Sequence, residues 1–184
     1  GIAAEKETGI MHVAVVGATG VVGQEILSVL EQRKFPVSRL RPLASARSAG
    51  RIIRFAGKDI PVEVAGPDSF TGVALVLASA GAAVTRALAP AIRKSGALLI
   101  DNSSAFRMDP DVPLVVPEVN PEALATHRGV IANPNCVAAI LTVGLAPLRA
   151  LGHIERLVVS TYQSASGAGA KAMEDLLVQT RDHL

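Results

Sequence analysis

The sequence predicts an α/β fold with a doubly wound, mostly parallel sheet, followed by the start of a second, α+β unit. Its 184 residues exceed the roughly 100 to 150 of a typical domain, which fits one domain plus part of another. Apolar residues make up 49% of the chain, enough to fill a core. Short β-branched runs alternate with stretches of helical periodicity, and this order predicts right-handed βαβ crossovers and an open parallel sheet.

Charge and composition exclude several classes of protein. The 18 Lys and Arg residues against 16 Asp and Glu leave a net charge of +2 without a basic block, so binding to nucleic acid or to a membrane surface gains no support. No apolar run approaches the roughly 18 residues of a membrane-spanning helix. The single cysteine, Cys136, cannot form an internal disulfide, which favours a reducing cytoplasm. We expect residues 1–10 to be an extension or tag, because Met11 directly precedes the first strand-like run.

The elements of the first unit, residues 11–133, follow from its apolar patterns. A β-branched run at 12–16 is followed by a glycine turn and a helical pattern that continues to Lys34. Segments 51–55 and 60–64 are expected to form a hairpin, and the continuous apolar run at 73–78 suits a strand covered on both faces. The remaining elements are strands at 40–44, 97–100, 114–116 and 130–132 and helices at 82–95 and 121–127.

The character of the sequence changes after Pro134. The expected elements there are a helix at 136–150, a strand at 154–162, a loop rich in Ser, Gly and Ala at 164–169, and an amphipathic helix from about residue 170. We expect this second unit, residues 134–184, to be incomplete.

Gly17, Gly20 and Gly23 form the pattern G-x-x-G-x-x-G between the first strand and the first helix. Because glycines lack a Cβ atom, backbone N–H groups can approach a pyrophosphate that lies at the positive end of the helix. No P-loop lysine follows these glycines. We therefore predict a Rossmann-like dinucleotide-binding domain, with a merely structural turn as the alternative.

The end of the second strand decides which dinucleotide is preferred. An Asp or Glu about 20 residues beyond the glycines would bind the ribose 2′-hydroxyl of NAD, and the sequence has neither there. Segment 43–51 instead offers Ser45, Arg47, Ser48 and Arg51, whose hydroxyl and guanidinium groups suit a 2′-phosphate and favour NADP. Alternatively, the two arginines are ordinary solvated loop charges.

Cys136 follows Asn133-Pro134-Asn135 and precedes an apolar helical pattern, so its sulfur is expected near a helix N-terminus. The partial positive charge there favours the thiolate, which is the nucleophilic form. Beside a nicotinamide, such a thiol can attack an acyl group and hold it as a thioester during hydride transfer. The alternative reading of a lone cysteine is a buried small hydrophobe.

Segment 101–107, DNSSAFR, follows an apolar strand. Its polar groups should therefore lie at the carboxyl end of that strand, the usual ligand edge of an open α/β sheet. Arg107 could bind an anion through two parallel hydrogen bonds, or it could be a surface arginine. The His, Cys, Asp and Glu residues show no metal-ligand spacing, so we predict no metal.

Six motifs follow one another along the chain: GATGVVG (17–23), ASARSAG (44–50), NSSAFR (102–107), PEVN (117–120), NPNC (133–136) and STYQSASGAG (160–169). With these motifs in this order, the chain resembles the aspartate-β-semialdehyde dehydrogenase family over residues 11–184, the amino-terminal half of such an enzyme. The related N-acetyl-glutamyl-phosphate reductases share the glycine turn and a catalytic cysteine, but PEVN and NPNC fit them poorly. The resemblance implies an NADP-binding domain at 11–133 and the truncated start of a catalytic and dimerisation domain at 134–184.

By this resemblance, the protein would reduce L-aspartyl 4-phosphate to aspartate 4-semialdehyde and phosphate with NADPH, on the route to lysine, threonine and methionine. It would act in the cytoplasm on a small acyl-phosphate substrate, as a homodimer or homotetramer when full-length, with no nucleic-acid or membrane partner.

The resemblance also implies roles for individual residues. Cys136 would be the acyl-thioester nucleophile, Gln163 would position the substrate, and Asn135 would help to polarise the carbonyl oxygen. Arg107 and Asn102 would bind substrate, Arg107 through the acyl phosphate. The residues that would contact NADP are Gly17, Thr19, Gly20, Val21, Val22, Gly23, Arg47, Ser48, Ser79, Gly81, Ser166 and Gly167.

The chain departs from the family pattern in places. Val137-Ala138-Ala139 follow the nucleophile where the family commonly has Ser-Thr, and Ser-Ala-Ser follows Gln163 where Ala-Val-Ser is frequent. The family's acid–base His and its substrate-binding Arg, Lys and Glu lie in the carboxy-terminal half, and His153 and His183 match no such motif. We therefore expect this chain to bind NADP without turning over substrate.

Two other functions remain compatible with the sequence. One is a catalytically inactive homologue with a binding or regulatory role, and the other is an acyl-CoA reductase on the same scaffold. Intact Cys136, Gln163 and Arg107 argue against the inactive homologue, whereas the glycine turn and the thiol alone do not exclude the acyl-CoA reductase.

Overall fold

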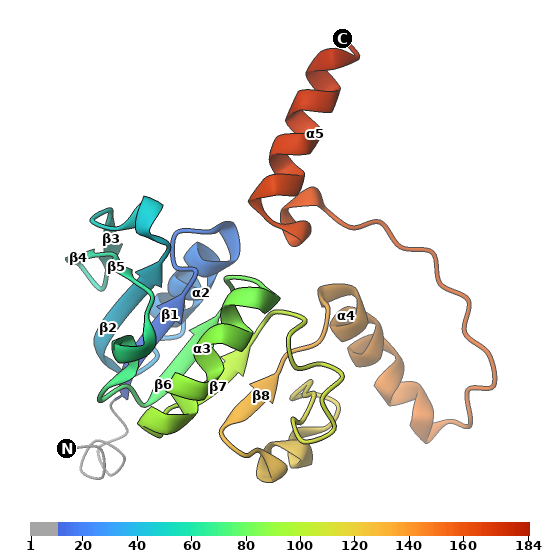
Figure 1. The fold of residues 1–184 in the computed structure, drawn as a ribbon. Helices are drawn as coiled ribbons and strands as arrows, with labels where there is room; N and C mark the ends of the chain where they lie inside the picture. The colour runs from blue at the N-terminus through green and yellow to red at the C-terminus, as the bar shows by residue number, and fades with distance from the viewer. Residues whose placement is uncertain (1–10) are drawn as a thin grey trace.

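A computed structural model of the protein describes residues 11–184, and the expected extension at 1–10 lies outside them. Its main body is a sheet in the order β5-β2-β1-β6-β7-β8, in which every neighbouring pair is parallel (Figure 1). The strands are β1 (Met11–Val16), β2 (Val37–Ala44), β5 (Glu63–Val64), β6 (Leu75–Ala78), β7 (Leu98–Asp101) and β8 (Val130–Ala132). The predicted doubly wound parallel sheet is confirmed.

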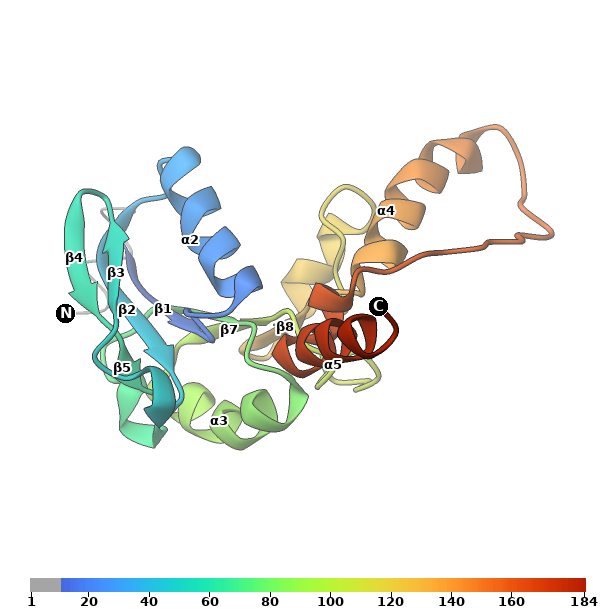
Figure 2. The ribbon, with the colours of Figure 1, turned by 90° about the horizontal axis from the view of Figure 1, so that it is seen from above.

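Two helices cover opposite faces of this sheet, as Figure 2 shows: α2 (Val21–Gln32) and α3 (Ala82–Ser95). Side chains of β1 alternate between the two layers, because successive residues of a strand point to opposite faces. Val13 and Val15 pack in the cluster that contains Leu27 of α2, and Val16 packs in the cluster that contains Ile92 of α3. All three valines are at most 1% exposed, which is why this β-branched run forms a central strand.

The expected hairpin forms, but its second arm divides. Strand β3 (Ile52–Phe55) pairs antiparallel with β4 (Lys58–Pro61), whereas β5 leaves the hairpin and joins β2 in parallel. The single strand predicted at 60–64 is therefore wrong. The chain turns at the buried Val62, whose N–H donates to the Arg51 carbonyl, and Arg41 of β2 then holds β5 through its ion pair with Glu63 at 3.4 Å.

Two short segments expected as regular elements are irregular. The segment 114–116 makes only an isolated bridge, between Leu114 and Ala132, and the expected helix at 121–127 is the 3₁₀ helix η3 (Pro121–Thr126). The side chain of Asn120 explains the first difference. Its Oδ1 accepts from the N–H of Val116 at 2.8 Å and its Nδ2 donates to the carbonyl of Leu114 at 3.0 Å, so these two backbone groups do not extend the bridge into a ladder.

The second unit contains helices but no strand among its described residues. Its elements are α4 (Cys136–Leu145), η4 (Ala146–Ala150), the 3₁₀ helix η5 (Ala165–Ala168) and α5 (Ala170–Asp182). The single helix expected at 136–150 ends as an α-helix at Leu145, because Pro147 has no N–H to continue the pattern.

The strand expected at 154–162 is not formed. This segment runs as an extended trace without a partner strand among residues 11–184 (Figure 1), and Val158 is 77% exposed and Tyr162 fully exposed. An apolar, β-branched run is not sufficient for a strand, because its N–H and C=O groups need a neighbouring strand to pair with. No helix between residues 11 and 184 is long and apolar enough to cross a membrane.

Substituting Gly23 should test how tightly α2 is packed on the glycine turn. A Cβ at Gly23 would lie 2.1 Å from the carbonyl oxygen of Gly17, which is a backbone atom and does not move away as a flexible side chain would. Gly23→Ala should therefore lower the free energy of unfolding by about 2 kcal/mol or more, as in overpacked cores.

The matched control is Gly144→Ala, because Gly144 is also helical but has open space where the Cβ would be. This variant should be neutral or more stable by roughly 0.5–1 kcal/mol, since alanine favours a helix. Urea denaturation measures the free energy of unfolding of both variants. An equal change at the two positions would contradict the packing role of Gly23.

Candidate active site

The carboxyl ends of four parallel strands are aligned in register. Their last residues, paired across the sheet, are Val16, Ala78, Asp101 and Ala132. The residues that follow them form a row at the sheet edge, which we call the edge row: Gly17, Ser79, Asn102 and Asn133. Each edge-row residue donates its N–H to a carbonyl of the neighbouring strand at 2.8–2.9 Å, so the ladder continues through the first loop residue. The register thus places the starts of four loops side by side.

The glycine turn is built by close contacts that exclude side chains. Gly17 has φ +86°, and a Cβ there would lie 3.0 Å from the backbone nitrogen of Ala80. The N–H of Gly20 donates to the Gly17 carbonyl at 3.0 Å, which closes the turn before α2 begins at Val21. No side chain caps the start of α2. Its first N–H groups are therefore available to an anion, as a pyrophosphate site requires.

The residues predicted for the ribose phosphate lie beside this turn. Thr19 Oγ1 donates to Ser48 Oγ at 3.3 Å, which joins the glycine turn to the 3₁₀ helix η1 (Ala46–Ser48) at the end of β2. Ser48 is buried, whereas Arg47 is exposed. Ser79 and Gly81 follow β6, and Gly81 adopts φ +91° immediately before α3. The structure thus brings the predicted cofactor residues of the first unit to one edge.

Arg107 is held against the edge row by its own guanidinium group. Its Nε donates to the carbonyl of Asn133 at 2.9 Å and its Nη2 donates to the carbonyl of Asn102 at 3.2 Å. The Nδ2 of Asn133 also donates to Oδ1 of Asn102. Asp101 is fully buried and accepts from the N–H and the hydroxyl of Ser103, both at 2.9 Å.

The sequence alone indicates no role for Asn133, which accepts a hydrogen bond from Arg107, or for Asp101, which accepts two from Ser103. Asn133 follows a strand directly, as Asn102 does, and this shared position was the signal that could have identified it.

Cys136 is the first residue of α4, and its side chain is exposed rather than buried. Asn135 caps this helix, because its Oδ1 accepts from the N–H of Val137 at 3.0 Å. The Sγ of Cys136 lies 4.0 Å from the same oxygen. The helix therefore starts at the thiol even though Val-Ala-Ala follows it, since the asparagine before the thiol supplies the cap.

Gln163 reaches this thiol site from a distant part of the chain. Its Oε1 accepts from the Nδ2 of Asn135 at 3.4 Å. Gly167 lies next to it, since a Cβ there would be 2.8 Å from the Nε2 of Gln163. In the part of the chain that the structure describes, no hydrogen bond joins Ser166 or Gly167 to the glycine turn. Of these two predicted cofactor residues, Gly167 is thus placed beside Gln163.

The two histidines of the second unit do not join the thiol site in the described structure. His153 and His183 are exposed, and neither makes a hydrogen bond to the thiol site in the described structure. Between residues 11 and 184, no three His, Cys, Asp or Glu side chains are grouped as metal ligands.

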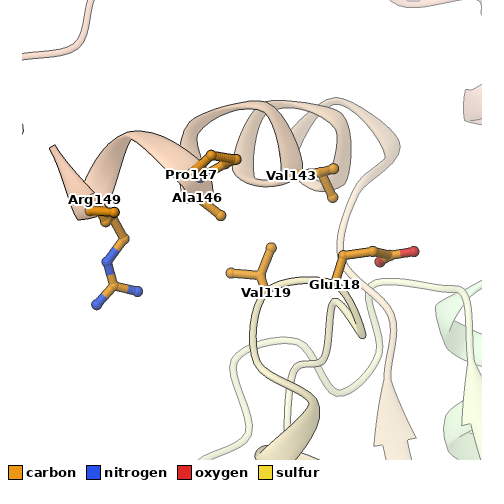
Figure 3. A pocket seen from close by; sticks show the side chains of 7 residues that line it. Glu118, Val119, Val143, Ala146, Pro147 and Arg149 are labelled. Carbon is orange, nitrogen blue, oxygen red and sulfur yellow. The ribbon is translucent and has the colours of Figure 1, made fainter.

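A groove of about 660 Å³ lies away from the thiol, between the PEVN segment and the end of α4 (Figure 3). Val119 points across it toward Ala146 and Pro147, while Glu118 and Arg149 lie at its two ends. Cys136 and Arg107 do not line it. The groove therefore offers no nucleophile, and the candidate active site is the sheet edge.

Known protein families match both units of the chain. The family described as "Semialdehyde dehydrogenase, NAD binding domain" matches residues 12–127, and "Semialdehyde dehydrogenase, dimerisation domain" matches residues 145–184. Aspartate-semialdehyde dehydrogenase of Synechocystis sp. is 53% identical over 95% of the chain and 52% of its own length. The Bacillus subtilis enzyme is 51% identical over 93% of the chain and 49% of its own length. The chain thus spans about half the length of the curated relatives it matches.

Solved structures agree with these sequence matches. Aspartate semialdehyde dehydrogenase II from Vibrio cholerae, complexed with ASA, superposes with a TM-score of 0.87 at 45% identity, over 94% of this chain and 52% of that one. The Candida albicans enzyme with NADP superposes with a TM-score of 0.72 at 27% identity, over 87% and 52% of the two chains. The predicted family and Rossmann-like fold are confirmed, and the chain belongs to the semialdehyde dehydrogenase family.

Proposed function

We propose that the protein reduces L-aspartyl 4-phosphate to aspartate 4-semialdehyde and phosphate with NADPH, through a thioester on Cys136. The observation that carries this proposal is the edge row. It brings a glycine turn, an anchored arginine and a thiol at the start of a capped helix to one side of the sheet. The relatives named aspartate-semialdehyde dehydrogenase, about half identical over nearly the whole chain, support the choice of substrate.

The glycine turn fits a dinucleotide pyrophosphate. Gly17 and Gly23 leave no room for side chains, and the first N–H groups of α2 have no side-chain cap. The exposed Arg47 beside Ser48 supports NADP over NAD, because a guanidinium can form charge-assisted hydrogen bonds with a 2′-phosphate. When bound, the reduced nicotinamide supplies the hydride.

Arg107 is the residue that would bind the phosphate group of the substrate. Two of its guanidinium nitrogens already donate to backbone carbonyls, so the planar group is oriented before substrate binds. A fixed positive charge stabilises both the bound acyl phosphate and the leaving phosphate without reorganisation during the reaction.

The thiol chemistry follows from the position of Cys136. The Cys136 sulfur forms a bond to the carbonyl carbon of the acyl phosphate, the bond from that carbon to the phosphate oxygen breaks, and phosphate leaves with the electron pair. Asn135 and Gln163, which lie within hydrogen-bonding reach of each other, are placed to orient the acyl group. After reduction of the thioester, the carbon–sulfur bond breaks and its electron pair returns to sulfur, which frees the aldehyde.

Proton transfer needs a group that the described residues do not place beside the thiol. We propose that a histidine from the part of the relatives' length that this chain does not cover acts as the acid–base group. We also propose a homodimer that uses residues 145–184, which match the family's dimerisation domain.

Arg47→Ala should weaken NADP binding more than NAD binding, because the guanidinium meets only the 2′-phosphate. A charge-assisted bond of roughly 1.5–3 kcal/mol corresponds to about a 10- to 150-fold loss of NADP affinity. Calorimetric titration of the chain with each dinucleotide measures this. Arg54→Ala is the control: Arg54 is also exposed but lies on β3, and its loss should leave both affinities unchanged. Equal losses for NADP and NAD would assign Arg47 to the pyrophosphate or to folding.

Nucleotide binding and turnover should separate in the 184-residue chain. We expect it to bind NADP but to show no reduction of aspartyl phosphate, because general acid–base catalysis typically contributes 10²–10⁴-fold. Adding the carboxy-terminal half of the Synechocystis relative should restore some activity, and Cys136→Ser should abolish it. Robust turnover by the chain alone would show that the base lies within it. Turnover of acyl-CoA in preference to aspartyl phosphate would contradict the proposed substrate.

Asn135→Ala should release the start of α4. The loss of the cap to Val137 should destabilise the helix by about 1 kcal/mol, whereas Asn135→Ser, which keeps a capping oxygen, should retain most of it. Hydrogen exchange of the amides at 137–139 measures the difference. Equal exchange in the two variants would show that the cap does not hold the helix that carries Cys136.

A further inference from the structure

Asn133 contacts the loop that carries Arg107 and stands on the segment that leads to Cys136. Its N–H donates to the Asp101 carbonyl at 2.8 Å, its carbonyl accepts from Arg107 Nε at 2.9 Å, and its Nδ2 donates to Asn102 Oδ1. It also lies three residues before Cys136 along the chain. One residue thus links the loop that carries the arginine to the loop that carries the thiol.

The backbone between Asn133 and the thiol has little freedom. Pro134 is buried, its ring fixes φ, and it restricts the conformation of Asn133 before it. Asn135 is then held by its cap to Val137. The position of the Asn133 carbonyl therefore determines where α4 begins relative to the Arg107 guanidinium.

The 101–107 loop has anchors that do not involve Asn133. The buried Asp101 accepts two hydrogen bonds from Ser103, and the Ser103 hydroxyl accepts from the N–H of Ala105 at 3.1 Å. Phe106 is 7% exposed, and Arg86 and Arg93 of α3 lie 5.5 and 5.9 Å from its ring centroid. Loss of the Asn133 side chain should therefore shift the contact between the two loops without unfolding either of them.

We propose that Asn133 is a positioning residue that sets the Arg107 guanidinium relative to Cys136. The bond between the Asn133 and Asn102 side chains holds their two carbonyls at the separation that Arg107 spans, and Arg107 is thereby directed at the phosphate of the acyl group that reaches the thiol. This inference rests on the proposed function of Arg107. In this role, Asn133 acts through Arg107 and touches neither substrate nor cofactor.

The test measures how inorganic phosphate protects the thiol in the 184-residue chain. Iodoacetamide alkylates Cys136, and phosphate bound at Arg107 should slow this alkylation in a saturable way. In Asn133→Ala, we expect the phosphate concentration for half protection to rise roughly five- to tenfold, the effect of one lost hydrogen bond in an oriented site. Arg107→Ala should abolish protection, and Asn133→Ala should add nothing in the Arg107→Ala background, because the two residues act as one unit.

Asn120→Ala is the matched control. Asn120 also makes two hydrogen bonds that hold a loop, to Val116 and Leu114, but it does not contact Arg107. This variant should change stability in urea by a similar amount and leave phosphate protection at the wild-type value. A purely structural role of Asn133 would give the same pattern as the control, and that result would overturn the proposal.

The remaining outcomes separate the inference from the proposed function. Wild-type protection in Asn133→Ala, with protection lost in Arg107→Ala, would overturn the role of Asn133 and leave the anion site standing. A wild-type thiol that does not respond to phosphate would overturn the anion site, and the inference with it. If Asn133→Ala does not fold, Asn133→Ser replaces it, since serine is too short to reach Asn102 and should give the same shift.

Discussion

The in-register alignment of four parallel strands is the constraint on which the site depends. Because Val16, Ala78, Asp101 and Ala132 are paired across the sheet, the loops that follow them start at the same height. Each of these loops brings a different group to the edge. The groups are a glycine turn, the start of a second helix, an anchored arginine, and a free thiol at the start of a helix that Asn135 caps. A slip of one residue in any strand would turn its side chains to the other face and move its loop out of this row.

The same alignment concentrates positive electrostatic potential at the edge. Helices α2, α3 and α4 each begin shortly after an edge-row strand, so their N-terminal ends gather where the proposed pyrophosphate and acyl phosphate would bind. The glycines allow this, since Gly17 and Gly23 bring α2 into van der Waals contact with the turn. On the other half of the edge, a hydrogen bond joins the neighbouring loops: Arg107, after β7, donates to the carbonyl of Asn133, after β8.

Local patterns were sufficient to predict most of the sheet, and tertiary pairing explains where they failed. The buried strands and the helix at 82–95 follow from β-branched runs and helical periodicity, which report burial directly. The extended segment at 154–162 has the same kind of pattern but no partner strand among the described residues, and a sequence pattern does not reveal the partner. Likewise, the NPNC motif indicated the thiol, but the contacts of Asn133 with Asn102 and Arg107 depend on strand register and were not predictable from spacing.

Amide hydrogen exchange with and without NADPH and phosphate tests most directly whether one sheet edge binds both the dinucleotide and the acyl phosphate. We expect NADPH to protect the amides of residues 18–22 and 79–82, and phosphate to protect those of 102–107 and 135–137. Both sets follow the carboxyl ends of the strands. Protection at the opposite edge of the sheet, around Gly72, Gly96 and Gly129, would contradict a shared site. So would protection by NADPH at one edge and by phosphate at the other.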